Sequence, residues 1–575
     1  MSSATLTAVT LALKSFPAVV VLDHVVECIS SLLDGSIMIP LDEACLTGST
    51  RLLNRIWESS DPNAEKSTSW SPCQHLRTDV YYCQFQFTKS LRAAVGRGDL
   101  GVVKWVLDHF SGCTAGVEVV EEAARHGQLK ILQYLLQYGH CGDRAVDTKN
   151  IILWGGDDLV NAIAEGHGHM GRWLYENTPD TRRNLETAMS YAVKQGDRPL
   201  VQWLIDVVYE AEPLLLPPSM DDAAAGGHME LLQWIYEQGY GGCSGNALEA
   251  AAKNGRLDMV QWLVENRVTK GAREGVRAAC GEGHLNVVQW LLERVDVQYP
   301  HFAMNCAIRQ GHLDIVKYLC KVGIVNEPSL MVIDAASNGH VHMIKWFLEN
   351  YGTEDLFPTV DPSRVGPSSQ TVMDRAANNG HLHILELLHS VAVEMQKEGK
   401  NGAPTCTNWA LESAAIMGHL EVVKWLQTHY TDLCFSSSTT SMVARNGNLK
   451  ILQWLHRRDD VEWSTGVMDS AAENGHLAVV KWLHVNRSEG CTTSAMNFAA
   501  ANGHRKVVQW LHFNRTEGCT VDAMDFAVGR EHFEVLLFLR ANRTEGCTTT
   551  AKILAREHKQ RHMLEWLEDQ YPESG

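Results

Sequence analysis

The chain has 575 residues, of which 45% are hydrophobic and 21% charged, a balance typical of a folded protein. Its formal net charge of −18 disfavours binding to nucleic acid or to anionic membranes, because both require a basic surface. The fifteen cysteines include no C-x-x-C pair, which argues against zinc sites and compact disulfide frameworks. We therefore expect free thiols and an intracellular protein, either cytoplasmic or nuclear.

Residues 1–60 are expected to be helical. The first 22 residues are apolar, but they lack the basic start of a secretory signal and Lys14 interrupts the run. Residues 41–57 place Ala44 and Gly48 in a spacing that recurs further along the chain, so we predict an N-terminal helical cap or degenerate repeat over residues 1–60. Residues 61–87 contain Pro62, Pro72 and several serines and are predicted to form a linker.

From about residue 88 a unit of about 28 residues recurs to the C-terminus, and each copy can be aligned on one residue, designated position 0. Fourteen copies have glycine there, and two later copies have Glu531 and Lys559, which makes sixteen repeats. The glycines are Gly98, Gly127, Gly166, Gly196, Gly227, Gly255, Gly283, Gly311, Gly339, Gly380, Gly418, Gly447, Gly475 and Gly503. Such self-similarity predicts an all-α solenoid over residues 88–575.

Each repeat is predicted to contain two short helices. The first resembles SAMNFAAANG (residues 494–503), with a Ser or Thr able to cap its start and a glycine able to close it. The second resembles HLAVVKWLHVN (residues 476–486), with apolar residues mostly at +2, +4, +5, +7 and +8. That wide apolar stripe is typical of a helix packed between two neighbours.

Position +7 is tryptophan in twelve of the sixteen repeats, and we name this set the tryptophan ladder. Its members are Trp105, Trp173, Trp203, Trp234, Trp262, Trp290, Trp346, Trp425, Trp454, Trp482, Trp510 and Trp566. One interpretation is a structural core stripe, stacked once per repeat. The alternative is an aromatic recognition surface like those of single-strand nucleic-acid binders. The core interpretation is favoured because the flanking residues are apolar and no basic groove accompanies the ladder.

The segment AAENGHLAVVKWLHVN (residues 471–486) resembles the ankyrin repeat, whose signature is A-A-x-x-G-H-x-x-V-V-x-x-L-L. The resemblance covers about 85% of the chain and looks most like the short, tryptophan-rich arrays of oomycete type. It implies a helical solenoid that binds other proteins and catalyses no reaction. Because the unit is shorter than the usual ~33 residues, and the T-P-L-H start is absent, we expect short loops in place of extended β-hairpin fingers.

Two recurring features have structural interpretations. The motif N-R-[ST]-E-G-C-T, starting at Asn486, Asn514 and Asn542, is predicted to connect one repeat to the next. Its cysteines should remain separate thiols, because equivalent positions in stacked helices lie about 8–10 Å apart and a disulfide needs Cα atoms within about 7 Å. Position +1 is histidine in ten repeats and otherwise polar, which predicts a hydrogen bond across the loops.

Insertions are predicted near residues 140–157, 351–371 and 391–408, each between one repeat and the next. The second insertion contains Leu356 and Phe357 beside acidic residues such as Asp361, and an apolar pair on an exposed loop would suit a partner protein. A disordered spacer is the alternative. If the insertion does not bind, recognition is expected on the first helices, at variable positions such as Glu473, Phe498 and Phe526.

The sequence therefore predicts a non-catalytic scaffold, monomeric, with proteins as partners and with no cofactor, metal, nucleic acid or membrane. No P-loop, H-E-x-x-H or G-x-S-x-G motif is present, which makes an enzyme with an unrecognised site the weaker alternative. Residues 16–36 resemble the start of an F-box, and this resemblance implies a substrate adaptor of a ubiquitin ligase as a further alternative.

Overall fold

The computed structural model describes residues 38–61, 70–140, 150–178, 184–211, 217–240, 243–297, 301–357, 371–400 and 402–572. The described residues form 35 α-helices and almost no strand, which confirms the predicted helical solenoid. The F-box-like segment 16–36 and the apolar segment 1–22 lie outside the described residues. Every helix in the described ranges is too short or too polar to span a lipid bilayer.

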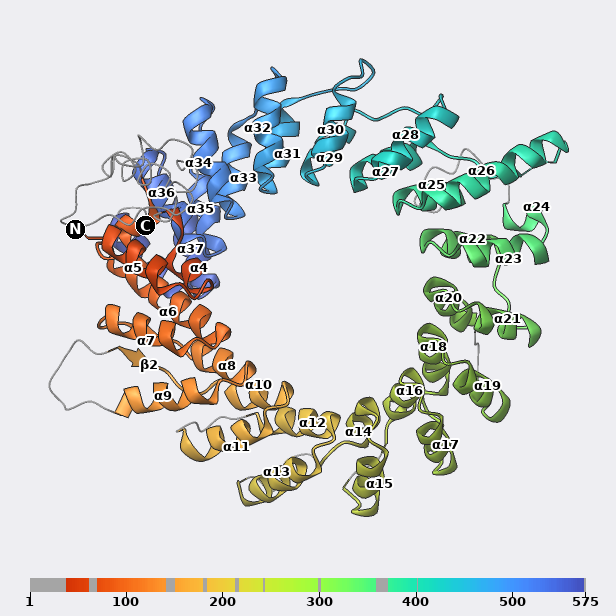
Figure 1. The fold of residues 1–575 in the computed structure, drawn as a ribbon, viewed down its shortest axis with the longest axis horizontal. Helices are drawn as coiled ribbons and strands as arrows, with labels where there is room; N and C mark the ends of the chain where they lie inside the picture. The colour runs from red at the N-terminus through yellow and green to blue at the C-terminus, as the bar shows by residue number, and fades with distance from the viewer. Residues whose placement is uncertain are drawn as a thin grey trace, which may run out of the picture. The chain divides into compact units, whose positions relative to one another are not determined.

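The chain divides into two compact units. Unit 1 combines residues 1–184 with residues 521–575. Its elements are α4 (Leu41–Cys45), α5 (Thr50–Ser59), the 3-10 helix η2 (Pro72–His75), α6 (Val80–Arg97), α7 (Leu100–His109), β1 (Thr114–Ala115), α8 (Glu118–Arg125), α9 (Leu129–His140), β2 (Ile151–Ile152), α10 (Asp158–Ala164), α11 (Gly168–Asn177), α35 (Asp522–Gly529), α36 (Phe533–Asn542), α37 (Thr549–Glu557) and α38 (Arg561–Gln570) (Figure 1).

Unit 2 comprises residues 185–520. Its helices are α12 (Leu185–Gln195), α13 (Arg198–Ala211), α14 (Met220–Gly226), α15 (Met229–Glu237), α16 (Gly245–Lys253), α17 (Leu257–Glu265), α18 (Ala272–Glu282), α19 (Leu285–Arg294), α20 (His301–Gln310), α21 (Leu313–Lys321), α22 (Pro328–Ser337), α23 (Val341–Asn350), α24 (Thr353–Leu356), α25 (Val372–Asn378), α26 (Leu382–Lys397), α27 (Asn408–Met417), α28 (Leu420–His429), α29 (Thr439–Arg445), α30 (Leu449–Leu455), α31 (Thr465–Glu473), α32 (Leu477–Asn486), α33 (Thr493–Ala501) and α34 (Arg505–Asn514).

The repeat formed by α31 and α32 illustrates the common packing. The first helix α31 packs against the first helices of both neighbouring repeats, α29 and α33. Its buried Ala471 and Ala472 leave room for this close approach, while Val480 and Leu483 of α32 fill the space between the two helices. The next first helix, α33, is capped by Thr492, whose side chain accepts a hydrogen bond from the Ser494 amide. The cap is therefore a threonine, as the sequence pattern predicted.

The anchor residue at position 0 ends each first helix in the left-handed conformation. Gly475 has φ 77°, and Glu531 and Lys559, the two anchors that are not glycine, have φ 65° and 56°. This agreement supports the assignment of both residues to the repeat register. A side chain with a Cβ atom pays about 1–2 kcal/mol for this conformation, so the last two repeats are strained at their turns.

We expect Glu531→Gly to raise the free energy of unfolding by about 1 kcal/mol, since glycine removes the strain of the left-handed turn. Urea denaturation followed by circular dichroism measures the change. Lys481→Gly is the control, because Lys481 is exposed inside α32 and glycine there should lower the free energy of unfolding by about 1 kcal/mol. If both variants changed the free energy of unfolding in the same direction, the assignment of Glu531 to position 0 would be contradicted.

Residues 41–59 fold as two helices around Gly48, which has φ 70°, the arrangement of a repeat. The linker predicted over residues 61–87 is wrong for its second half, because η2 and the start of α6 lie there. Helix α6 begins early because the Asp79 side chain accepts from the Tyr82 amide and because Phe85 and Phe87 are buried. Residues 62–69 lie outside the described residues.

The insertions are partly ordered in their described portions. Residues 151 and 152 form β2, which pairs in parallel with β1, and the buried Asn150 side chain bonds to the Cys113 amide and the Phe110 carbonyl. This two-residue pairing leaves the predicted all-α class unchanged. Residues 353–356 form α24, and the insertion predicted at 391–408 begins with an extension of α26 to Lys397. Residues 141–149 and 358–370 lie outside the described residues.

Within unit 1 the last repeats pack against residues 70–97, an arrangement that we name the end contact (Figure 1). The indole Nε1 of Trp566 donates to Asp79 Oδ2 at 2.9 Å, and Gln86 Nε2 donates to Glu534 Oε1 at 2.9 Å. The Phe533 ring meets the rings of Tyr82 and Phe85 at centroid distances of 5.6 and 5.3 Å. The apolar side of the final repeats is thereby covered by residues more than 440 positions earlier in the sequence.

Candidate functional site

In many of the repeats a hydrogen bond from the side chain at position +1 joins the repeat to the one before it, as the polar pattern predicted. His476 Nε2 lies 2.9 Å from the Arg445 carbonyl, and His284 Nε2 lies 3.0 Å from the Lys253 carbonyl. In both cases the acceptor is at position −2 of the preceding repeat, so Nε2 must carry the hydrogen. The residue at −1 can donate to the same carbonyl, as Asn379 does beside His381 at Ser337.

The same contact explains why position 0 favours glycine for a second reason. A Cβ atom on Gly475 would lie 2.6 Å from Nδ1 of His504, and one on Gly447 would lie 2.6 Å from the ring of His476. The imidazole of each repeat thus occupies the space that a side chain on the preceding anchor would need. Asparagine, glycine and histidine of the recurring N-G-H motif together form a joint between repeats, which the resemblance alone did not explain.

A second joint was not foreseen from the sequence. Asp469 accepts from the backbone amide and the hydroxyl of Thr492, both at 2.8 Å. At the equivalent place Asn497 accepts from the Thr520 amide at 2.9 Å and donates to the Thr520 hydroxyl at 2.7 Å. Burial raises the pKa of the Asp469 carboxyl, which these bonds partly offset. The joint could have been found from the co-occurrence of Asp or Asn at −6 with Ser or Thr at +17.

We expect the stability of unit 2 to fall as the pH is lowered from about 7 to about 5. Burial lowers the pKa values of His381 and His504, whereas the unfolded chain has histidine pKa values of about 6.5. The unfolded state then binds more protons, so stability that is fully present above pH 6.5 is lost below it. Denaturant titration across this range should show a smaller loss for His381→Gln/His504→Gln.

Glutamine is a suitable replacement because the chain already has it at this position. Gln560 Nε2 donates to the Gly529 carbonyl at 3.4 Å, in the same way as the histidines. The double variant therefore keeps the hydrogen bond and loses the titrating group. An unchanged pH dependence in that variant would show that other groups govern the acid sensitivity.

The tryptophan ladder lies at the border of the core rather than inside it. Trp105 and Trp566 are buried at 8% and 1% exposure, and the other ten members are half-buried. The fully buried stripe instead runs through positions +4, +5 and +8, such as Val479, Val480 and Leu483. Ten of the twelve indoles therefore lie at the border of the predicted core stripe, whereas Trp105 and Trp566 lie inside it.

The indoles still join adjacent repeats through a regular aromatic contact. The ring at +9 of one repeat meets the Trp at +7 of the next edge-on, with interplanar angles near 90° and centroids 5.1–5.9 Å apart. The pairs are Trp57–Trp105, Tyr236–Trp262, His389–Trp425, His456–Trp482 and His484–Trp510. The ladder therefore contributes contacts between adjacent repeats.

Because Trp482 is half-buried, we expect Trp482→Ala to lower the free energy of unfolding by about 2 kcal/mol, less than a fully buried aromatic residue. Leu483→Ala should lower it by about 3 kcal/mol, since Leu483 is almost completely buried. Lys481, the exposed neighbour, provides the control, because Lys481→Ala should change the free energy of unfolding by less than about 0.5 kcal/mol. Denaturant titration of the three variants tests the order, and a larger effect for Trp482 than for Leu483 would contradict it.

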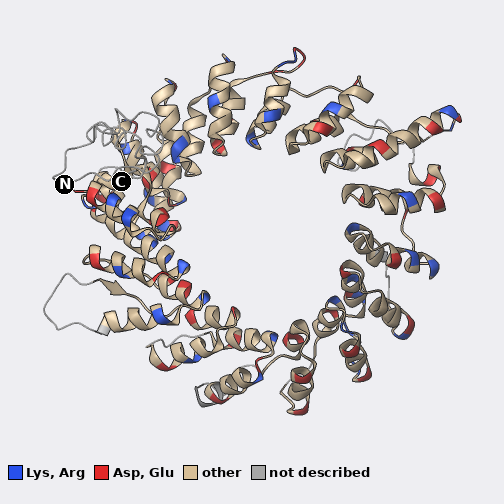
Figure 2. Cartoon of the chain, viewed as in Figure 1, with Lys and Arg blue, Asp and Glu red and all other residues tan. Residues whose placement is uncertain are grey.

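The first helices present a face that differs from repeat to repeat. At position −5 stand Met442 and Phe498, both large, apolar and exposed, and Asp334, which pairs with Arg309 at 3.2 Å. Glu473, at −2, is half-buried and pairs with Arg445 at 3.5 Å. Phe526 is equivalent to Phe498 and is exposed in unit 1. Figure 2 shows Lys and Arg interspersed with Asp and Glu along the helices.

The insertion at 351–371 does not present the predicted anchor. Leu356 and Phe357 are buried at 1% and 5% exposure, so the interpretation of this pair as an exposed binding element is wrong. The short helix α24 packs against α22 and α23, and this contact gives the two apolar side chains a place in the core. Asp361 lies outside the described residues.

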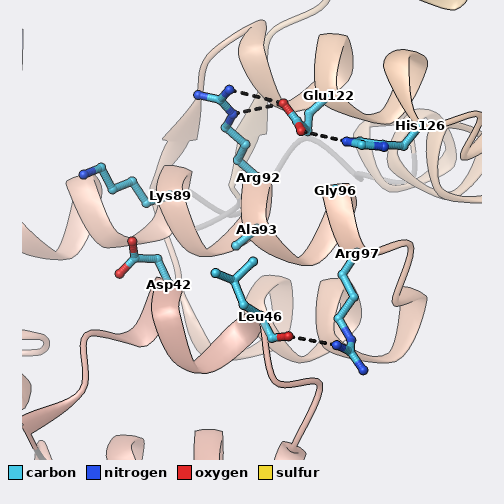
Figure 3. Close-up of a pocket in the computed structure, with 9 residues that line it drawn as sticks. All are labelled: Asp42, Leu46, Lys89, Arg92, Ala93, Gly96, Arg97, Glu122 and His126. Carbon is cyan, nitrogen blue, oxygen red and sulfur yellow. Dashed lines mark hydrogen bonds and ion pairs between the residues drawn. The ribbon is translucent and has the colours of Figure 1, made fainter. Parts of the chain in front are cut away.

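A groove of about 480 Å³ lies on the first-helix face of unit 1, between α4, α6 and α8 (Figure 3). Its walls contain Asp42, Leu46, Lys89, Arg92, Ala93, Gly96, Arg97, Glu122 and His126. Glu122 is held at one side, since its carboxylate accepts from Arg92 at 3.2 Å and from Arg125 and His126 at 3.0 Å. Gly96 leaves the space that this carboxylate occupies.

No cluster of three or more His, Cys, Asp or Glu side chains suitable for a metal ion occurs among the described residues. None of the thirteen described cysteines forms a disulfide, and Cys491 and Cys519, at equivalent positions of consecutive repeats, are both buried. Burial raises the pKa of Cys491 to about 12, which keeps this thiol protonated and unreactive. The features found among the described residues are therefore contacts between repeats and exposed surfaces.

Three segments match family models, and all lie in unit 2. Residues 220–264 and 468–512 match the model described as "Ankyrin repeats (many copies)". Residues 332–436 match the one described as "Ankyrin repeats (3 copies)". Parts of the chain are therefore similar to ankyrin repeats, in agreement with the resemblance of residues 471–486. No curated protein matches the chain.

Solved structures with detectable similarity include helical-repeat proteins. The pentatricopeptide repeat protein PPR10 from maize is 12% identical, with 98% of this chain and 91% of that chain covered and a TM-score of 0.27. The same protein in complex with an 18-nt psaJ RNA element is 10% identical, with 99% and 98% covered and a TM-score of 0.27. TM-scores this low support no conclusion about function.

Proposed function

We propose that the chain is a non-catalytic scaffold that binds other proteins through the first helices of its repeats. The observation that carries the proposal is the contrast between uniform joints and a variable face. Positions that join repeats, such as the histidine at +1, change little, whereas position −5 ranges from Met442 and Phe498 to Asp334. A rigid frame that presents different side chains at equal intervals suits recognition of an extended protein surface.

The similarity to ankyrin repeats supports the same proposal, because binding to proteins is the usual role of that family. Members of the family are generally non-catalytic, which favours a scaffold over an enzyme. An intracellular location belongs to the proposal as well, and it is supported by fifteen cysteines without a C-x-x-C pair.

The test is affinity capture with the full chain from its native cell, followed by mass spectrometry, using two matched double variants. Met442→Glu/Phe498→Glu changes two exposed apolar residues of the first helices in unit 2. Val485→Glu/Phe513→Glu makes the same change at two exposed apolar residues near the ends of second helices. Partners lost only with the first variant support the proposal. Partners lost only with the second would place recognition on the second helices, and an absence of any captured protein would count against a scaffold.

A further inference from the structure

The groove of unit 1 carries a surplus of cations in a chain that is acidic overall. Lys and Arg number 50 against 68 Asp and Glu in the whole chain, yet the groove has three Lys or Arg side chains and His126 against two carboxylates. Glu122 already pairs with Arg92, Arg125 and His126. Lys89 and Arg97 are therefore the cations of the groove that remain available to bind an anionic ligand.

Lys89 and Arg97 stand at opposite ends of the groove (Figure 3). Among the described residues no carboxylate lies within 4.0 Å of Lys89 Nζ, which instead rests 4.3 Å from the Phe85 ring centroid. Arg97 donates to the Leu46 carbonyl at 2.8 Å, and its nearest carboxylate oxygen, on Asp99, is 3.9 Å away. The two residues are eight positions apart on α6, which is about 12 Å along the helix axis.

The space between the two cations is apolar and contains one unsatisfied acceptor. Leu46 is 59% exposed and faces Ala93 across the floor of the groove. Asp42 Oδ1 is shielded from solvent and has no hydrogen-bond partner among the described residues. A buried carboxylate oxygen of this kind favours a ligand that supplies an N–H donor.

Resting on the proposed function, we infer that this groove binds an acidic segment of a partner protein. An extended peptide advances about 3.3 Å per residue, so carboxylates about four positions apart would match the separation of Lys89 and Arg97. An aliphatic side chain between the two carboxylates would cover Leu46 and Ala93. A backbone N–H of the peptide would donate to Asp42 Oδ1. A nucleic-acid strand fits less well, because its regularly spaced phosphates would also meet Asp42 and Glu122 between the two cations.

The probe is a fluorescein-labelled nine-residue peptide with two glutamates four positions apart and a leucine midway, in a Gly/Ser background. Fluorescence anisotropy with the full chain measures binding. We expect saturable binding that is at least tenfold weaker when glutamine replaces both glutamates, and weaker when serine replaces the leucine. A single-stranded RNA of equal charge serves as the competing polyanion.

Two variants with matched controls test the site. Lys89→Glu should weaken peptide binding about tenfold, whereas Lys481→Glu, an exposed lysine of α32, should leave it unchanged. Leu46→Ser should also weaken binding, with Val485→Ser as its control, and circular dichroism checks that each variant is folded. Equal binding by wild type and Lys89→Glu, equal binding of the glutamine peptide, preference for RNA, or no saturable binding would each overturn the inference. If captured partners persist while the peptide fails, the groove inference fails and the scaffold proposal survives.

Discussion

Trp566→Ala should destabilise unit 1 by about 4 kcal/mol, the effect of truncating a fully buried aromatic side chain. The indole is 1% exposed, its Nε1 donates to Asp79, and its ring lies 5.7 Å from that of Phe533. The end contact joins α38 to α6, so the loss should appear at both ends of the sequence. Hydrogen exchange should accelerate in residues 80–97 as well as in residues 561–570.

Two comparisons separate this contact from ordinary core truncation. Trp566→Phe keeps an aromatic ring but loses the N–H donor and part of the ring volume, so it should destabilise by about 2 kcal/mol. Trp482→Ala, in unit 2, should leave exchange in residues 80–97 unaltered. If Trp566→Ala accelerates exchange only in residues 561–570, the packing of the last repeat on α6 is not significant in solution.

Gly475→Ala should destabilise unit 2 by about 3 kcal/mol, as the sum of two physical effects. The left-handed conformation at φ 77° accounts for about 1–2 kcal/mol when a Cβ atom is added. The remainder arises because that atom would lie 2.6 Å from Nδ1 of His504 and would force the ring out of its joint. Urea denaturation of the full chain measures the total.

Gly166→Ala isolates the first effect. Gly166 has φ 82° at the same position of its repeat, but a Cβ atom there would meet nothing within 4 Å. That variant should therefore lose only about 1–2 kcal/mol. In a double-mutant cycle, His504→Ala should relieve part of the loss caused by Gly475→Ala. Equal losses for the two glycine variants and a zero coupling would show that the histidine does not form the joint.

The sequence predicted those features that one repeat displays by itself. The anchor at position 0, the apolar positions and the polar role of +1 all follow from a period of 28 residues, and even Glu531 and Lys559 take the expected left-handed conformation. Apart from the hydrogen bond of position +1, the contacts that join different repeats were not predicted. The bond between Asp469 and Thr492 spans 23 residues and requires knowledge of which loops meet.

Two further features of the structure were not predicted, because they too depend on contacts between distant parts of the sequence. The end contact links residues such as Gln86 and Glu534, for which no periodic pattern exists. Leu356 and Phe357 stand in an insertion with prolines and acidic residues, a composition typical of an exposed loop, yet α24 packs them against α22 and α23. Local composition reports the average environment of such a segment and cannot indicate a neighbour that the chain brings back to it.

The joints between repeats also bear on how a chain of this kind changes in evolution. Each joint connects fixed offsets, as when His476 at +1 meets the carbonyl of Arg445 at −2 of the preceding repeat. A duplicated unit of 28 residues therefore carries both halves of every joint, and its gain or loss leaves the packing of the flanking units complete. Insertions of other lengths, such as residues 358–370, stand in the sequence between a second helix and the next first helix, and His381 still meets the Ser337 carbonyl across 44 positions. The number of side chains available for recognition can thus grow or shrink in whole units, without compensating changes in the core.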